Sequence, residues 1–512
     1  MKKILTLVIL TCICINLMAC TNGGTDANES EPTRIKIARP VDSSILDPVM
    51  SGKNPEIWML TLVVESLLAI SDDGQSVIPG IAETWEKSSD NLSFTFHLYD
   101  NLMFSDGSPV TRDDLLWNLE RVMTTVEGAN HYLYSNWDSI EVPDDRTVII
   151  HMKEARAFDD EFFTYFPSGI ISKAHYYGEV SNDFTSQVPI GTGPFYFAEW
   201  KQDEYMVLAK NPYYRFADQV IADEVIFTIV PDDNTRIMQL QAGEVDIITH
   251  VPLNRMDDLE NTDGLTAFAS AASTSNTIFF NCSVAPFNQT NVRQALAMAI
   301  DRQDIVDVVL FGYGTPATTF LPLGIPYSNQ NINTHSYDID AAKQLLTDAG
   351  YPDGLEMTIT ISAGDTIQEQ IAVLLTDQWG KIGINVTIQT VEDVVRREMR
   401  DNIQINHIST WSSDIPDPSQ IVSFWCIPSV LSNMGTGWEN SKAEDLAIKA
   451  EVELNKEKQS ELYTELQELY AEEVPAIVLY YSGNPVAMKD SISGFVQIPF
   501  GNYRMNGLTI SD

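Results

Sequence analysis

The 512-residue sequence has few cysteines and few basic residues. Of its 5 Cys residues, Cys12, Cys14 and Cys20 lie near the N-terminus, so only Cys282 and Cys426 belong to the main body. Two cysteines in so large a chain do not make a disulfide scaffold; they either form one bridge or remain two small buried hydrophobic residues.

Basic residues are outnumbered: 31 Lys and Arg stand against 72 Asp and Glu, which gives a formal net charge of −41. A surface of this charge repels polyanions, so nucleic acid is excluded as a partner. The excess acid either forms a solvated exterior that keeps the protein soluble or favours cationic and zwitterionic ligands.

The motifs of metal sites and nucleophilic enzymes are also missing. The 7 His residues are dispersed, and the sequence contains no His-Glu-x-x-His, no Cys-x-x-Cys, no Gly-x-Ser-x-Gly and no Walker-type loop. Gly191-Thr192-Gly193 is too short to cradle a phosphate and precedes a strand-like run, so a tight turn fits it better. We therefore expect no enzyme activity, no cofactor and no metal.

The first 20 residues differ from everything after them. Lys2 and Lys3 precede a mostly apolar run over residues 4–18, and a small residue, Ala19, precedes Cys20. This pattern is typical of a signal peptide. The alternative, a retained membrane helix, is disfavoured because the run is shorter than the ~20 residues that spanning requires.

The end of this leader, Leu17-Met18-Ala19-Cys20, resembles the lipobox of bacterial lipoproteins, in which cleavage before the cysteine leaves a thiol that carries lipid. The resemblance implies that residues 1–19 are a signal peptide and that Cys20 is lipidated. Residues 20–32 have the small, polar composition of a flexible tether. We expect the protein to be anchored to the cell membrane, facing the cell exterior or the periplasm.

The body of the chain alternates helical and strand-like patterns, which predicts an α/β protein of two or three domains, since single cores stop growing at ~250–300 residues. Thr111 and Asp114 form a partial capping-box pattern before a predicted helix. Predicted helices cover residues 55–70, 115–123, 292–300, 340–349, 368–381, 392–400 and 443–473. Predicted strands cover residues 92–98, 195–200, 224–229, 246–249, 277–281, 357–361 and 385–389.

A series of blocks occurs in a fixed order along residues 33–510. The blocks are Val77–Trp85, Phe94–Leu98, Phe104–Thr111, Gly191–Phe195, Asn211–Tyr214, Leu240–Asp246, Pro286-Phe287, Val292–Leu296, Ala299–Arg302, Tyr337-Asp338, Ala342–Leu346 and Ala349–Tyr351. This order resembles the extracellular solute-binding proteins of ABC transporters, in the oligopeptide, dipeptide and nickel-binding family (family 5). Tyr99-Asp100-Asn101 departs from it, because members usually carry Arg and then an acidic or Gly turn there.

The resemblance implies a periplasmic-binding-protein-like type II bilobal fold with an extra small domain and a ligand cleft between the lobes. It assigns residues 33–70, 186–276 and 486–512 to lobe I, residues 71–185 to the small domain and residues 277–485 to lobe III. The crossings near residues 277 and 485 would be a hinge that closes around a ligand. We expect a monomer.

For the ligand, the resemblance points to Asp414, which follows Trp411 by three residues. In peptide-binding relatives a carboxylate at this position meets the α-ammonium group of the peptide, a charge-assisted contact. The alternative is that Asp414 caps the turn at Pro416, and Trp411 either floors the ligand pocket or packs in the core.

Further ligand contacts are expected from Gly52-Lys53-Asn54, which would pair with the main chain of a bound peptide. The arginine with which dipeptide-specific relatives hold the free carboxylate is absent from the loop Ser362–Asp365. Arg400, Arg396 or Arg397 could substitute for it, or could be exposed.

The sequence thus predicts the substrate-binding lipoprotein of an ABC importer, which captures peptides and delivers them to a membrane permease and its ATPase. Alternatives are a binder of a nickel chelate or an oligosaccharide in the same fold, or a surface sensor that does not transport. A secreted hydrolase is disfavoured by the missing catalytic constellation.

Overall fold

A computed structural model of the protein describes residues 32–128, 131–156, 159–176, 188–332, 335–430 and 432–511. Thr33–Asp512 form one compact unit, and the finer division into lobes remains a prediction. The signal peptide, Cys20 and the tether before Pro32 lie outside the described residues. Within the described ranges, no helix is both long and apolar enough to cross a membrane.

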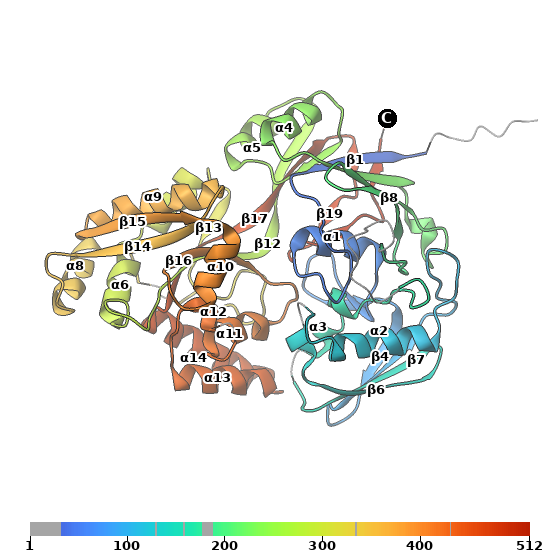
Figure 1. The fold of residues 1–512 in the computed structure, drawn as a ribbon, viewed down its shortest axis with the longest axis horizontal. Helices are drawn as coiled ribbons and strands as arrows, with labels where there is room; N and C mark the ends of the chain where they lie inside the picture. Colours follow the sequence, from blue (N-terminus) through green and yellow to red (C-terminus); the bar gives the residue numbers. More distant parts are fainter. Residues whose placement is uncertain are drawn as a thin grey trace, which may run out of the picture. The chain divides into compact units, whose positions relative to one another are not determined.

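One large mixed sheet organises the chain, in the order β15-β14-β16-β12-β17-β11-β1-β10-β9-β8, with β13 paired to β17. Its two end groups contain parallel pairs, and antiparallel β12 and β17 run between them (Figure 1). The strands are β1 (Arg34–Arg39), β8 (Phe195–Lys201), β9 (Tyr205–Lys210), β10 (Glu224–Ile229), β11 (Ile247–Thr249), β12 (Leu265–Phe279), β13 (Gly314–Pro316), β14 (Leu355–Ser362), β15 (Ile384–Val391), β16 (His407–Ser412) and β17 (Ala476–Lys489).

The β12–β17 ladder is the main correction to the predicted strands. The sequence indicated a strand only over residues 277–281, whereas β12 has 15 residues and β17, with 14, was not predicted. Residues 269–276 are small or polar without alternation, so the local pattern does not predict a strand, and pairing with β17 and β16 makes parts of this segment extended. The register shifts between Ser270 and Thr274, opposite Gly483, where an added Cβ would collide with the carbonyl oxygen of Ser270.

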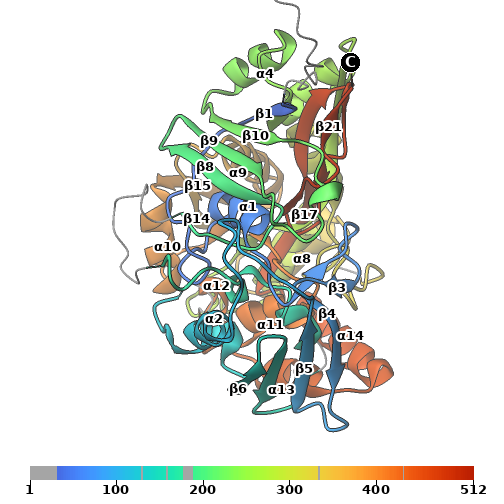
Figure 2. The same ribbon diagram turned by 90° about the vertical axis from the view of Figure 1, so that its right-hand side faces the viewer.

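A second, antiparallel sheet has the order β4-β5-β7-β6 and is built from β4 (Ala82–Lys87), β5 (Ser93–Leu98), β6 (Trp137–Asp144) and β7 (Thr147–Met152). Figure 2 shows β4, β5 and β6 of this sheet at the bottom of the view, below β8 and β9. The predicted alternation of β5 is confirmed, since Phe94 and Phe96 are buried and pack against Phe163 with tilted and edge-on rings. Helix α2 (Arg112–Thr124) contacts β6, and its capping box between Thr111 and Asp114 is confirmed.

The predicted helix over residues 55–70 is two elements. Helix α1 (Asn54–Val63) ends where Val64 turns extended, and β2 (Leu68–Ile70) pairs with β3 (Val77–Pro79). Backbone groups after Val64 bond to distant segments; the carbonyl of Glu65, for example, accepts from the N–H of Ile170. These tertiary hydrogen bonds override the local helical pattern.

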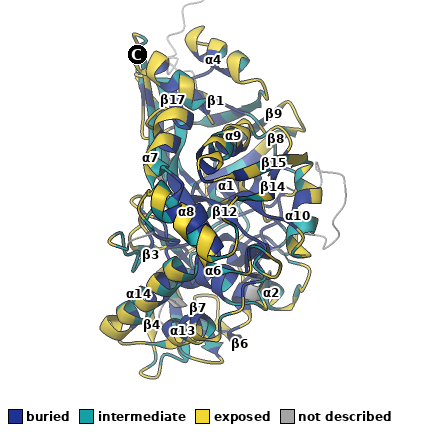
Figure 3. Cartoon of the chain, turned by 90° about the vertical axis from the view of Figure 1, so that its left-hand side faces the viewer, coloured by how far each residue is buried: buried dark blue, intermediate teal, exposed yellow. Residues whose placement is uncertain are grey.

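The second half of the chain is rich in helices, and the predicted helices there exist with shifted ends. The predicted helix over residues 443–473 is interrupted, because Glu453 leaves the helical conformation and Asn455 caps the next helix. Figure 3 shows exposed faces along α8 and α14. Helices of this half are α6 (Thr290–Met298), α7 (Arg302–Asp304), α8 (Ile339–Asp348), α9 (Thr366–Gly380), α10 (Asp393–Asp401), α11 (Pro418–Cys426), α12 (Ser432–Gly435), α13 (Ser441–Val452) and α14 (Lys456–Glu473).

The remaining named elements are short. They are α3 (Asp159–Phe162), α4 (Asp233–Gln241), α5 (Met256–Glu260) and the two-residue strands β18 (Ile492–Ser493), β19 (Val496–Gln497), β20 (Tyr503–Arg504) and β21 (Thr509–Ile510). The pairs β18–β21 and β19–β20 bring the C-terminal segment back on itself.

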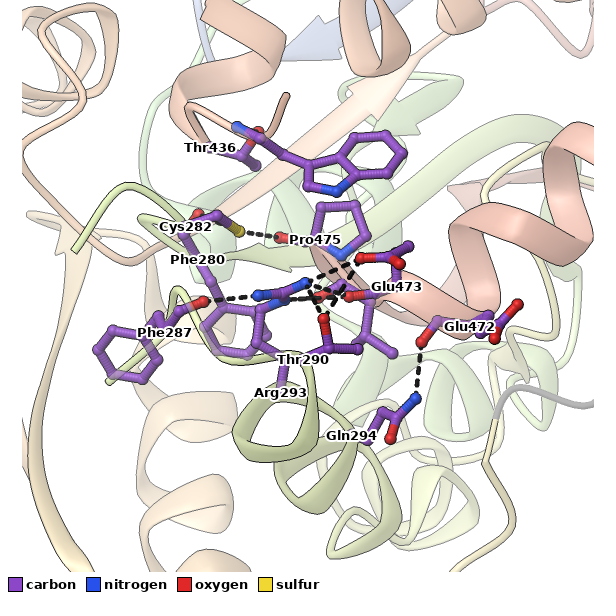
Figure 4. Close-up of polar contacts among 12 residues, drawn as sticks. Phe280, Cys282, Phe287, Thr290, Arg293, Gln294, Thr436, Glu472, Glu473 and Pro475 are labelled. Carbon is purple, nitrogen blue, oxygen red and sulfur yellow. Dashed lines mark hydrogen bonds and ion pairs between the residues drawn. The ribbon is translucent and has the colours of Figure 1, made fainter. Parts of the chain in front are cut away.

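A buried arginine joins α6 to the end of α14 (Figure 4). The side chain of Arg293 donates to the carbonyl oxygens of Phe287 (2.7 Å), Glu473 (2.5 Å) and Val474 (3.0 Å). The last carbonyl groups of a helix lack intrahelical partners, so a buried guanidinium at this end satisfies them. Arg293 therefore fixes how these two helices meet.

Cys282 and Cys426 are both free, so the bridge that the sequence left open is not formed. Cys426 is buried, and the thiol of Cys282 donates to the carbonyl oxygen of Phe280 at 3.5 Å. Burial raises the pKa of Cys282 to about 11. Both residues behave as small hydrophobic groups rather than as reactive thiols.

Candidate ligand-binding site

A cavity of about 580 Å³ lies among segments that are far apart in the sequence. Its walls come from the end of α1, the β2–β3 hairpin, the turn Thr164–Phe166, the loop Tyr214–Gln219, the C-terminal segment 494–507 and Asp414. The volume lies within the ~300–1,000 Å³ range of pockets for small ligands.

Asp414 is the contribution of residues 277–485 to this wall, and it is partly buried. Its Oδ2 accepts hydrogen bonds from the Tyr165 hydroxyl (2.9 Å) and from Nε2 of Gln420 (3.1 Å). Burial raises the pKa of the carboxyl group, and these two hydrogen bonds act in the opposite direction. No ion pair to Asp414 is found in the part of the chain that the structure describes.

The helix that begins after Pro416 is capped by Asp417 rather than by Asp414. Asp417 caps α11, and its carboxylate accepts from the backbone N–H of Ser419 at 2.7 Å and from the Ser419 hydroxyl at 2.6 Å. The carboxylate of Asp414 is held by Tyr165 and Gln420 instead, at the cavity wall.

Trp411 lies on β16 and packs its ring against Phe424, with 4.6 Å between ring centroids. It joins the hydrophobic cluster of the second half and is not part of the cavity lining. Its geometry therefore favours core packing over contact with a ligand in this cavity.

Gly52, Lys53 and Asn54 are exposed at the start of α1. Lys53 occupies the N-cap position with an extended backbone, and Asn54 is the first helical residue. None of the three lines the cavity, which approaches the opposite end of the same helix.

The three candidate arginines of α10 also lie away from this cavity. Arg400 pairs with Asp401 at 2.8 Å, and Arg397 pairs with Asp393 at 2.7 Å. Arg396 is buried rather than exposed, because it donates to Asp393 and to the hydroxyl of Ser362. Each of these charges is used within its own part of the fold.

Two other arginines, which the sequence reasoning missed, line the cavity. Arg215 is bound by both carboxylate oxygens of Glu65, at 2.7 and 2.8 Å, and lies over the rings of Tyr99 and Phe216. Arg504 pairs with Asp72 at 3.1 Å and donates to the carbonyl oxygen of Ile70. No motif marks either residue, since both reach the cavity only through long-range packing.

The charged side chains that line the cavity are two ion pairs and one further carboxylate. The pairs Glu65–Arg215 and Asp72–Arg504 are each neutral, and Asp414 adds one carboxylate without a cationic partner among the described residues. The cavity is therefore complementary to a ligand that brings one positive charge to Asp414.

The two strand groups joined by β12 and β17, with a cavity that residues from both halves line, define a ligand-binding protein of the periplasmic-binding type. The family model of bacterial extracellular solute-binding proteins, family 5 (middle), matches residues 76–432. The chain belongs to this family, as its ordered blocks predicted.

Relatives of known name agree with this placement. The chain is 28% identical over 478 residues to heme-binding protein A of Haemophilus influenzae, which covers 88% of this chain and 87% of that protein. It is 29% identical over 470 residues to di/tripeptide-binding protein 1 of Pseudomonas aeruginosa, covering 86% and 87%. These relatives are named as solute-binding proteins rather than enzymes.

Solved structures confirm the predicted type II bilobal fold. The periplasmic binding protein DppA of Helicobacter pylori, solved with the peptide STSA, superimposes with a TM-score of 0.80 at 25% identity, over 94% of this chain and 99% of that one. CtaP of Listeria monocytogenes gives a TM-score of 0.86 at 21% identity, over 94% and 100%, and supports the fold alone.

Proposed function

We propose that this protein is the substrate-binding component of an ABC importer, that it captures peptides, and that it delivers them to a membrane permease and its ATPase. The observation that carries this proposal is Asp414, a partly buried carboxylate on the cavity wall without a cationic partner among the described residues. A peptide α-ammonium group supplies the missing charge.

The energetics favour such a ligand. Hydrogen bonds that involve a charged group contribute about 1.5–3 kcal/mol, more than neutral ones. Tyr165 and Gln420 each donate to Oδ2 and hold the carboxylate in place before the ligand arrives, which reduces the ordering cost of binding.

The proposal includes the membrane anchor. Cleavage before Cys20 and lipidation of its thiol would attach the body through the polar residues 20–32. The family description as extracellular proteins supports a site of action outside the cytoplasm.

Isothermal titration calorimetry with a pool of short peptides tests the ligand. The nearly isosteric change Asp414→Asn removes the charge, and we expect at least a tenfold loss of affinity, about 1.4 kcal/mol. Asp218→Asn, which alters an exposed aspartate beside the cavity residue Gln219, is the matched control and should bind as the unchanged protein does.

Chemical variants of the ligand sharpen the same test. N-acetylated peptides should bind at least tenfold more weakly than free peptides, and equal affinities would refute the role of Asp414. A nickel chelate, an oligosaccharide or heme bound in preference to every peptide would place this chain with other ligand classes of the family. The presence or absence of neighbouring permease and ATPase genes would separate a transporter component from a surface sensor.

A further inference from the structure

A second, much smaller cavity of about 30 Å³ lies in the second half of the chain, among α6, the end of α14 and β17. Its lining shares no described residue with the candidate ligand-binding site. Arg302, the first residue of α7, brings a positive charge to its wall, and none of the described residues that line it is Asp, Glu or Lys. The cavity therefore carries one charge without a counter-charge in its wall.

Arg302 differs from the other arginines that pack into the fold. Each of these pairs with a carboxylate: Arg39, Arg215, Arg236, Arg293 and Arg396. Arg302 is partly buried, and its side chain makes one hydrogen bond within the described part of the chain, from Nε to the carbonyl oxygen of Val478 at 2.9 Å. The N–H donors of Nη1 and Nη2 thus lack an acceptor among the described residues.

Neighbouring titratable groups do not neutralise Arg302. Burial lowers the pKa of Arg302 to about 10, and among the described residues only the phenolic group of Tyr481 opposes this effect. Burial also lowers the pKa of His335, another residue of the wall, and the charge of Arg302 adds to this shift against Glu472 and the carbonyl group of Ala471. His335 is therefore neutral near pH 7. The field of Arg302 reaches across the cavity.

The carbonyl groups at the end of α14 attract cations, as helix C-termini do, but other side chains occupy them. They accept as follows, the last two in Figure 4: Ala471 from His335, Glu472 from Gln294 and Glu473 from Arg293. The side-chain oxygen of Gln467 accepts from the hydroxyl of Thr319. A desolvated guanidinium without acceptors is unfavourable, so a ligand that supplies both an acceptor and a negative charge gains free energy here.

We propose that this cavity binds one small monovalent anion of chloride size through Nη1 and Nη2 of Arg302. A cavity needs about 10–15 Å³ to hold a water molecule, so about 30 Å³ admits an ion little larger than water. A phosphate or sulfate group, with four oxygens around its central atom, exceeds this space. The bound anion stabilises the meeting of α7, β17 and the end of α14. This inference is independent of the proposed function and of the peptide cavity.

Thermal unfolding in mixtures of sodium chloride and sodium gluconate at a fixed sodium concentration tests the proposal. The ionic strength stays constant, and gluconate is too large for the cavity. Because a ligand that binds only the folded state raises the Tm, the unchanged protein should gain at least about 2 °C between about 5 and about 500 mM chloride. Arg302→Gln should lose most of this gain, and Arg302→Lys, which keeps the charge, should retain part of it.

Arg112→Gln is the matched control. Arg112 is exposed and has no ion pair among the described residues, so its replacement makes the same change in net charge away from the cavity, and the full chloride gain should persist. An equal gain in Arg302→Gln and in the unchanged protein, or no gain in the unchanged protein, overturns the proposal.

Crystals of the unchanged protein grown with sodium bromide locate the ion without relying on a variant that folds. Bromide occupies halide sites and scatters anomalously, so an anomalous peak should lie in contact with Nη1 or Nη2 of Arg302. A water molecule at this place, or bromide at other places only, overturns the proposal. Neither result affects the peptide site, whose own test is calorimetry.

Discussion

Replacing Glu161 with glutamine is expected to stabilise the protein at pH 8 and to change little at pH 5. Glu161 lies on α3 and faces Asp417 at the start of α11. Burial, together with the charge of Asp417, raises the pKa of Glu161 to about 8. Burial also raises the pKa of Asp417, to about 7, and the side chain of Asp417 is fully buried.

Other charged groups from several elements lie near Glu161 and Asp417, and they only partly offset the repulsion between these two carboxylates. Arg156 pairs with Glu451 of α13 at 2.6 Å, and Lys87 pairs with Asp160 at 3.0 Å. Burial raises the pKa of Glu451 as well, against the opposing effect of Arg156. The charged and titratable groups around the pair are Lys87, Glu154, Arg156, Asp160, Glu451 and Tyr463.

The sign and size of the stability change follow from the linkage between proton binding and folding. When folding raises the pKa of an acid, the acid does not lower the free energy of unfolding at a pH below its unfolded-state pKa. As the pH rises from the unfolded-state pKa to the folded-state pKa, the free energy of unfolding falls. Each pKa unit corresponds to about 1.4 kcal/mol, so the full shift of Glu161 bounds the effect at about 5 kcal/mol. Because Glu161 and Asp417 repel each other, part of this penalty belongs to the pair, and we expect the substitution to recover about 2–3 kcal/mol at pH 8.

Thermal unfolding of the ligand-free protein at pH 5 and pH 8 measures the stability gain of Glu161→Gln at each pH. For a body of this size about 1 kcal/mol shifts the Tm by roughly 1 °C, so Glu161→Gln should raise the Tm by about 2–3 °C at pH 8 and by less than about 1 °C at pH 5. Glu86→Gln, at an exposed position on β4, is the control and should shift neither value. An equal Tm change at both pH values would refute the reasoning.

Three further outcomes are expected. Arg293→Met should destabilise the protein by about 3–5 kcal/mol in urea unfolding, because it leaves the buried carbonyl groups of Phe287 and Val474 and the partly buried carbonyl group of Glu473 without their donor; a loss below about 1 kcal/mol would contradict this. Gly483→Ala should lower the urea midpoint, by about 2 kcal/mol or more in free energy, since its Cβ meets the carbonyl oxygen of Ser270. Alkylation of the denatured protein without reductant should label Cys282 and Cys426 in peptide maps, and a disulfide-linked peptide would disagree with the structure.

Much of the local structure was predictable because it depends on neighbouring residues. The capping box at Thr111, the alternation of β5 and the helix α9 follow from side-chain types a few positions apart. The predictions failed where distant partners decide the conformation. Small residues of β12 become extended through pairing with β17, and the segment after Val64 leaves the helix to bond with residues about a hundred positions away.

The residues of the candidate site also fall into those that the sequence predicted and those that only the structure revealed. The resemblance to peptide-binding relatives pointed to Asp414, and the structure places this residue at a cavity wall. Tyr165, which donates to it, lies 249 residues away and carries no motif. Gly52, Lys53 and Asn54 were expected near the ligand, but the cavity opens at the other end of α1. Their role as ligand contacts remains a prediction.

The sequence by itself predicted the family through its ordered blocks and the α/β class through local periodicity, because both are properties of neighbouring residues. Asp414 followed from the resemblance, and its role stays a prediction. Only the tertiary structure decided which charges are already paired and which remain available. Arg396 and Arg504 are the same residue type, yet Arg396 is buried against Asp393 and Arg504 is 33% exposed at a cavity wall. Whether a charged side chain can pair with a ligand depends on its burial and on the partners that the fold brings near it, and the local sequence predicts neither.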